Sequence, residues 1–225
     1  MKLYITKLKE GICIIRTLKQ QDIARMFMRP AEYYENPVHQ GKLGTTVKQI
    51  QAWQKKQSKG KYCYEDVWAG FNMPAKVWEE WHSGSVQLCG QGKFSFNRYE
   101  KELIKALLGN KSELDSIAYI IGVYGGEKSK WMKATLMHEI AHALYYTSKE
   151  YKRNSIKLLK TIPLSFRKEA FKVLAKMGYA SSVLNDELQA YLSTGLGRKL
   201  RKVFKDTKFE SEFKGYFNKK KVLDK

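Results

Sequence analysis

Alternation of apolar and polar residues predicts two strands at the start of the chain, followed by a helix. Residues 2–8 alternate between the two kinds, and residues 12–18 are rich in β-branched side chains, so we expect a short hairpin. From Gln20 the spacing becomes helical, and Pro30 is expected to end this helix at Arg29. The polar, glycine-bearing stretch that follows predicts a loop.

Three more helices are expected in the first half of the chain, each preceded by a residue that can cap it. The first follows Thr45 or Thr46 and runs to Gln57, the second begins at Asn72 and ends near Ser83 and Gly84, and the third follows Asn97 and covers residues 98–108. Aromatic side chains are dense between the first and third helices. We expect most of these rings in the hydrophobic core rather than in a platform for bases or peptide side chains.

The strongest strand signal, residues 116–124, lies directly before a helical segment at residues 129–148. A strand in this place can line a cleft and pair a free edge with an extended peptide. Alternatively, it is an interior strand of a sheet and has no free edge. Further helices are expected at residues 153–160, 163–177 and 181–195.

Together these elements predict an α+β protein that is mainly helical and has a small sheet. The 225 residues are enough for one sizeable core, and we expect one compact unit. Within it we expect an N-terminal α/β region at residues 1–110, a core region at 111–196 and a basic tail at 197–225. Aromatic residues lie among the lysines of the tail, which favours helices that pack their rings on the core over a surface for nucleic acid or membrane.

The composition of the chain limits the cellular location and the binding partners that we expect. The net charge of +20 attracts polyanions such as nucleic acid, although it can also act as a solubilising surface. Lysine outnumbers arginine, and no arginine-rich cluster predicts the readout of bases. The sequence has neither a signal peptide nor an apolar stretch of membrane-spanning length, and its three cysteines lie far apart. We therefore expect no disulfide framework and a cytoplasmic location.

Candidate chemistry is concentrated in one pentapeptide, which contains His138, Glu139 and His142 in an H-E-x-x-H pattern. Histidines four residues apart lie one turn above each other on a helix, so both rings can bind one metal ion. A zinc ion held by two histidines and one further protein ligand keeps a position for water and lowers the pKa of that water to about 7. The adjacent glutamate can then take the proton as a general base.

A third metal ligand is expected on the later helix at residues 181–195. Glu187 is the candidate, with its neighbour Asp186 as the alternative, because carboxylates serve as zinc ligands. Tyr191 follows Glu187 by one helical turn, where it can hydrogen-bond a reaction intermediate, orient a ligand or simply pack. Of the two remaining histidines, His39 is expected to be exposed in a loop and His82 to end the second of the capped helices.

The sequences HEIAH and NDELQAY, which begin at His138 and Asn185, resemble the gluzincin type of zincin zinc metallopeptidase. The resemblance covers about residues 115–196. It implies a zincin-like core with zinc bound by His138, His142 and Glu187 in a cleft, and with Glu139 as the general base. It also implies that the preceding strand is an edge strand that aligns a protein or peptide substrate.

Two functions of different classes are therefore compatible with the sequence. The first is a zinc-dependent metallopeptidase that cleaves protein or peptide substrates, with Glu139 activating the water. The second is a basic nucleic-acid-associated protein in which the metal site is structural or vestigial. The second predicts salt-dependent binding to nucleic acid that survives loss of both motif histidines.

Overall fold

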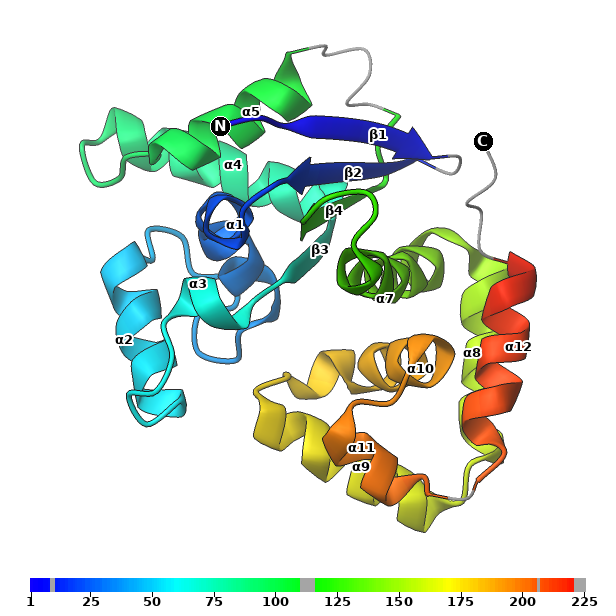
Figure 1. The fold of residues 1–225 in the computed structure, drawn as a ribbon. Helices are drawn as coiled ribbons and strands as arrows, with labels where there is room; N and C mark the ends of the chain where they lie inside the picture. The colour runs from blue at the N-terminus through cyan, green and yellow to red at the C-terminus, as the bar shows by residue number, and fades with distance from the viewer. Residues whose placement is uncertain (9–10, 110–115, 206, 221–225) are drawn as a thin grey trace. The chain divides into compact units, whose positions relative to one another are not determined.

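The computed structural model describes residues 1–8, 11–109, 116–205 and 207–220. The chain forms two compact units, Met1–Thr135 and Leu136–Lys225, and the division falls within helix α7 (Lys130–Thr147). Unit 1 contains a four-stranded sheet with helices packed against it, and the described part of unit 2 is helical (Figure 1). The prediction of a mainly helical α+β protein is confirmed.

The sheet of unit 1 consists of β1 (Tyr4–Leu8), β2 (Ile12–Thr17), β3 (Gly70–Pro74) and β4 (Tyr119–Tyr124). Its order is β1-β2-β4-β3, in which β2 and β4 are parallel and the two outer pairs are antiparallel. The predicted hairpin is confirmed. The strand that precedes the motif helix is flanked on both sides, so its expected role as an edge strand for an extended peptide is wrong. Buried isoleucines and valine of β2 and β4 hold these two strands at the centre of the sheet.

Helix α1 (Gln20–Glu35) continues through Pro30, although the sequence predicted an end at Arg29. A proline within a helix removes one hydrogen bond and costs about 3 kcal/mol. Burial of the side chains of Ile23, Met26 and Phe27 outweighs this cost, because each contributes roughly 1.5–3 kcal/mol. The ring of Phe27 lies against β4 at Gly122, where a Cβ atom would come within 2.7 Å of it.

The further helices of unit 1 in the described part of the chain are α2 (Val47–Gln57), α3 (Tyr64–Val67), α4 (Ala75–Gly90), α5 (Arg98–Leu108) and the first turns of α7. The caps predicted for α2 and α5 are confirmed, since Thr46 and Asn97 both form capping boxes. Most rings of the aromatic segment are buried in the core, as expected, and Tyr62 is an exposed exception.

The helix predicted to begin at Asn72 is wrong at both ends. Residues 70–74 instead form β3, because they pair with β4 and bury Phe71 and Met73. Helix α4 begins at Ala75 and passes through Gly84 without a break. A glycine fits there because Leu43 packs against the helix, and an added Cβ atom would lie 2.4 Å from its Cδ1.

Unit 2 consists of the rest of α7, α8 (Lys149–Thr161), α9 (Leu164–Met177), the short 3₁₀ helix η2 (Ser181–Val183), α10 (Leu184–Thr194), α11 (Arg198–Val203) and α12 (Phe209–Lys220). Its core is formed by apolar residues of α8 to α12. Phe204, Phe213 and Phe217 of the basic tail are buried, so the prediction that the rings of the tail pack on the core is confirmed. In the part of the chain that the structure describes, none of the helices has the length and apolar character needed to cross a membrane.

The predicted boundaries after residues 110 and 196 are not tested by the division at Thr135, and residues 110–115 lie outside the described ranges. The candidate metal ligands all lie within unit 2.

Candidate metal centre

Helices α7 and α10 position the candidate ligands inside unit 2. Seven consecutive residues of α7, 139–145, are buried, which is typical of a helix covered on all sides. The buried residues of α10 include Glu187, Leu188 and Gln189. The amide of Gln189 donates a hydrogen bond of 3.2 Å to the carbonyl oxygen of Ala141, which joins the two helices next to the motif.

His138, His142 and Glu187 converge on one point. The Nε2 atoms of the two histidines lie 3.3 Å apart. The carboxylate oxygens of Glu187 lie 3.6 Å from Nε2 of His142 and 3.9 Å from Nε2 of His138. Among the described residues, this is the only group of three histidine, cysteine or acidic side chains whose ligand atoms come together closely enough for a metal ion.

The spacing of the two histidine nitrogens suits a tetrahedral metal ion. Two nitrogen ligands at ~2.05 Å from zinc subtend a distance of about 3.3 Å, which matches the separation of the two Nε2 atoms. Glu187 is a few tenths of an ångström farther from each histidine, so it completes the set with a small movement of its side chain. These residues therefore fit a metal centre with two nitrogen ligands and one carboxylate.

The outer nitrogen of each histidine ring also has a partner. Nδ1 of His138 lies 3.2 Å from the hydroxyl oxygen of Thr194, and that hydroxyl donates to the carbonyl oxygen of Ala190 at 2.7 Å. The hydroxyl therefore accepts the Nδ1 proton of His138. A neutral imidazole carries its proton on only one nitrogen. With the proton on Nδ1, the lone pair of His138 Nε2 faces the point where the three side chains converge.

Asp186 orients the other histidine. Its Oδ1 atom lies 3.0 Å from Nδ1 of His142, an ion-pair contact without the alignment of a hydrogen bond. The amide of Gln189 donates to the same oxygen at 3.0 Å, and the hydroxyl of Tyr151 on α8 donates to the amide oxygen of Gln189 at 3.1 Å. Asp186, which the sequence offered as an alternative ligand, thus contacts the outer nitrogen of His142 and lies outside the group of three. Carboxylates commonly orient metal-binding histidines in this way.

Burial and neighbouring charges shift the pKa values of the acidic groups and the histidines in this centre. Burial raises the pKa of Glu187 to about 8, and the neighbouring charges of Asp186 and Glu139 act in the same direction against the opposing effect of His142. Burial lowers the pKa of His138 well below its usual value. Burial also opposes protonation of His142, but the charges of Asp186 and Glu187 outweigh it and hold its pKa well above the usual value. A bound divalent cation would offset the negative charge of the three carboxylates.

Glu139 is buried and lies next to His138 in sequence, outside the group of three. Its charge acts on His142, Glu187 and Tyr191, which places its carboxylate beside the same centre. Its carboxylate therefore lies near the centre without belonging to the group of three.

Tyr191 packs its ring on His138, with 4.7 Å between the ring centroids. Its hydroxyl lies 3.2 Å from the hydroxyl of Tyr179, which also hydrogen-bonds the carboxylate of Glu187. Burial and the charge of Glu187 raise the pKa of Tyr191 to about 12, so its phenol stays protonated at neutral pH. Sequence reasoning missed Tyr179, which follows the left-handed cap of α9 at Gly178 and carries no motif.

The other two histidines take no part in this centre. His39, expected to be exposed, is buried at 9% exposure with its ring edge-on to Trp53, and this burial lowers its pKa. The prediction failed because the loop after α1 folds back through its own hydrogen bonds, which include those to Asn36. His82 lies within α4 and stacks on Trp78 at a centroid distance of 5.0 Å.

Comparison with protein-family models, with curated proteins and with solved structures found no match to the chain. The case for a function therefore depends on the geometry of His138, His142 and Glu187.

Proposed function

We propose that this protein is a zinc-dependent metallopeptidase. The observation that carries the proposal is the convergence of His138, His142 and Glu187 at distances suited to a tetrahedral ion, with Glu139 beside them. When bound, zinc supplies a water of lowered pKa and polarises the carbonyl group of the substrate.

Side chains of the protein transfer the proton and hold the metal ligands in place. The carboxylate of Glu139 takes the proton from the attacking water and delivers it to the leaving amine. Asp186 and Thr194 contact the outer nitrogens of the two histidines, so that both Nε2 atoms stay directed inward. The hydrogen bond from Tyr179 holds Glu187 in the ligand position.

A protein or peptide substrate is proposed from the resemblance of HEIAH and NDELQAY to gluzincins. Substrate alignment cannot use β4 in the way that an edge strand would allow, because both edges of β4 are paired. Hydrolysis must therefore be tested with unfolded or flexible substrates, such as fluorescently labelled peptides of mixed sequence.

Metal analysis of the purified full-length protein tests the centre directly. We expect about one equivalent of zinc in the wild type and in the His82→Ala control, and none in His138→Ala. Equal zinc content in His138→Ala and the wild type would overturn the proposed site.

The peptidase step is tested by Glu139→Gln. This variant is expected to keep its zinc and to lose activity by about 10²–10⁴-fold, because the amide cannot accept the proton of the water. Full activity in a zinc-loaded Glu139→Gln protein would exclude the mechanism. A zinc-loaded wild type without any hydrolytic activity would favour the structural site of a nucleic-acid-associated protein.

A further inference from the structure

Helix α8 carries a row of cations on the side opposite the core of unit 2. Its inward side buries Tyr151, Ser155 and Leu159, which follow one another at intervals of four residues. The opposite side is exposed and presents Lys149, Arg153, Lys157 and Lys160, here named the α8 basic face. Intervals of four, four and three residues keep these four side chains on one stripe of the helix.

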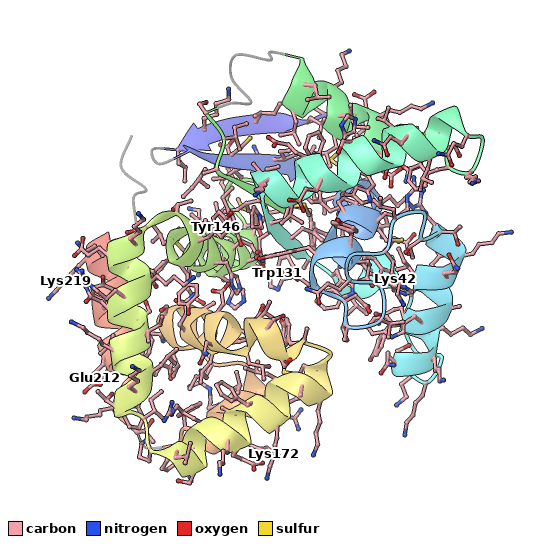
Figure 2. All side chains as sticks on the ribbon, turned by 180° about the vertical axis from the view of Figure 1, so that it is seen from behind. Lys42, Trp131, Tyr146, Lys172, Glu212 and Lys219 are labelled. Carbon is pink, nitrogen blue, oxygen red and sulfur yellow. The ribbon has the colours of Figure 1, made fainter. Side chains whose placement is uncertain are left out.

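Within the described part of the chain, no acidic side chain balances the charge of the α8 basic face. The single acidic residue of α8, Glu150, pairs with Lys220 of α12 at 2.9 Å. None of the four cations of the face has a carboxylate within ion-pair distance among the described residues. Helix α12 lies beside α8, and Lys219 projects from it as a further exposed cation (Figure 2). The face therefore offers positive charge to a partner.

The chemistry of the face excludes several kinds of partner. Its exposed residues include no aromatic ring on which single-stranded bases could stack, and no large apolar side chain that could enter a membrane. One arginine among three lysines suits phosphate contacts and is not suited to reading bases. The face runs from Lys149 to Lys160, a rise of about 16 Å along the helix, which is enough to reach phosphates on both sides of a major groove of about 12 Å.

We propose that the α8 basic face binds the phosphate backbone of double-stranded nucleic acid without reading its sequence. The proposal does not depend on the metal centre, since none of its residues is a candidate ligand. Binding there would hold unit 2, with its metal centre, at a polyanionic assembly.

Fluorescence anisotropy of the full-length protein with a labelled 20-base-pair duplex of arbitrary sequence tests whether the α8 basic face binds the phosphate backbone. A variant with Gln at Lys149, Arg153, Lys157 and Lys160 is compared with a control that has Gln at Lys48, Lys55, Lys56 and Lys61 of unit 1, which are also exposed. Both variants lower the net charge by the same amount. Circular dichroism and thermal unfolding establish that both variants fold.

In the wild type and the control, the affinity should fall steeply with salt. In the α8 variant, the negative slope of log affinity against log salt should become less steep by about 3.6, or about 0.9 for each phosphate that is no longer neutralised. Equal weakening in both variants would show that only net charge matters and would overturn the proposal. So would the absence of duplex binding by the wild type, tighter binding to a single strand of equal length, or binding to phosphatidylserine vesicles in place of the duplex.

Discussion

Each unit contains a group of buried charges, and the two groups are neutralised in different ways. In unit 1, the guanidinium of Arg29 binds the carboxylate of Glu100 through two nitrogens, and it also donates to the carbonyl oxygen of Ser95. The backbone amide of Asn97 completes the hydrogen bonds of this carboxylate. Every charge of this group is paired by another part of unit 1.

In unit 2, the carboxylates of Asp186 and Glu187 contact two histidines, and among the described residues no lysine or arginine lies within ion-pair distance of either carboxylate. The Oε2 atom of Glu187 is buried and accepts no hydrogen bond within the described part of the chain. A closed ion pair such as Arg29–Glu100 needs both of its members to keep the fold stable, whereas an open group of donors can be completed by a cation from solution. The following predictions test this difference.

The largest effect is expected from Arg29→Met. It leaves the carboxylate of Glu100 buried without its cation, which should lower the free energy of unfolding by about 3–5 kcal/mol. Arg25→Met is a matched control, because Arg25 is half exposed and its ion pair with Glu65 should contribute less than about 1 kcal/mol. Urea unfolding of the zinc-free proteins measures the free energy of unfolding of both variants. If the two variants lose equal stability, the buried pair has no special role.

Zinc should stabilise the wild type by about 4 kcal/mol when free zinc exceeds its dissociation constant 1,000-fold, as measured by thermal unfolding against zinc concentration. Arg29→Met should retain this gain, and Glu187→Gln should lose most of it. Because burial raises the pKa of Glu187 to about 8, a proton occupies this carboxylate below that pH and competes with zinc. Zinc affinity should therefore rise as the pH is raised through about 8, because Glu187 and His142 both release a proton on binding. A gain of equal size in Glu187→Gln would place the zinc elsewhere.

A smaller effect is expected from Gln189→Ala, which removes the amide that holds Asp186 against His142. Loss of such an outer partner commonly lowers metal affinity by about 10–100-fold. Ser193→Ala is the control, because it removes only a contact with the hydroxyl of Tyr151. Competition with a fluorescent zinc chelator measures both variants. Unchanged affinity in Gln189→Ala would mean that Asp186 orients His142 without support from the amide.

The local parts of the centre were predictable from sequence, and the parts that depend on packing were not. Intervals of four residues fix where His138 and His142 lie on a helix, and a capping residue fixes where a helix begins, as at Asn97. Whether Asp186 or Glu187 faces the histidines depends on the rotation of α10 against α7, which no local pattern specifies. The roles of Tyr179 and Gln189 depend on the same contact between distant elements.

Two errors in unit 1 have the same origin. The rule that proline ends a helix describes the isolated segment, but the buried side chains on both sides of Pro30 keep α1 continuous. The segment Gly70–Pro74 has a sequence that suits a helix start, yet it becomes a strand because β4 offers an edge to pair with.

The parallel pairing of β2 with β4 constrains the order in which the protein can fold during its synthesis. Ile14 lies opposite Ile121, so the centre of the sheet joins segments that are separated by about a hundred residues. Pairing over such a separation is slow, because the intervening chain must be brought together first. During synthesis, β2 cannot pair with β4 until β4 has left the ribosome. The motif helix is the next segment to emerge. A ribosome that stalls before β4 should therefore hold a hairpin whose inner edge is open to aggregation or to a chaperone.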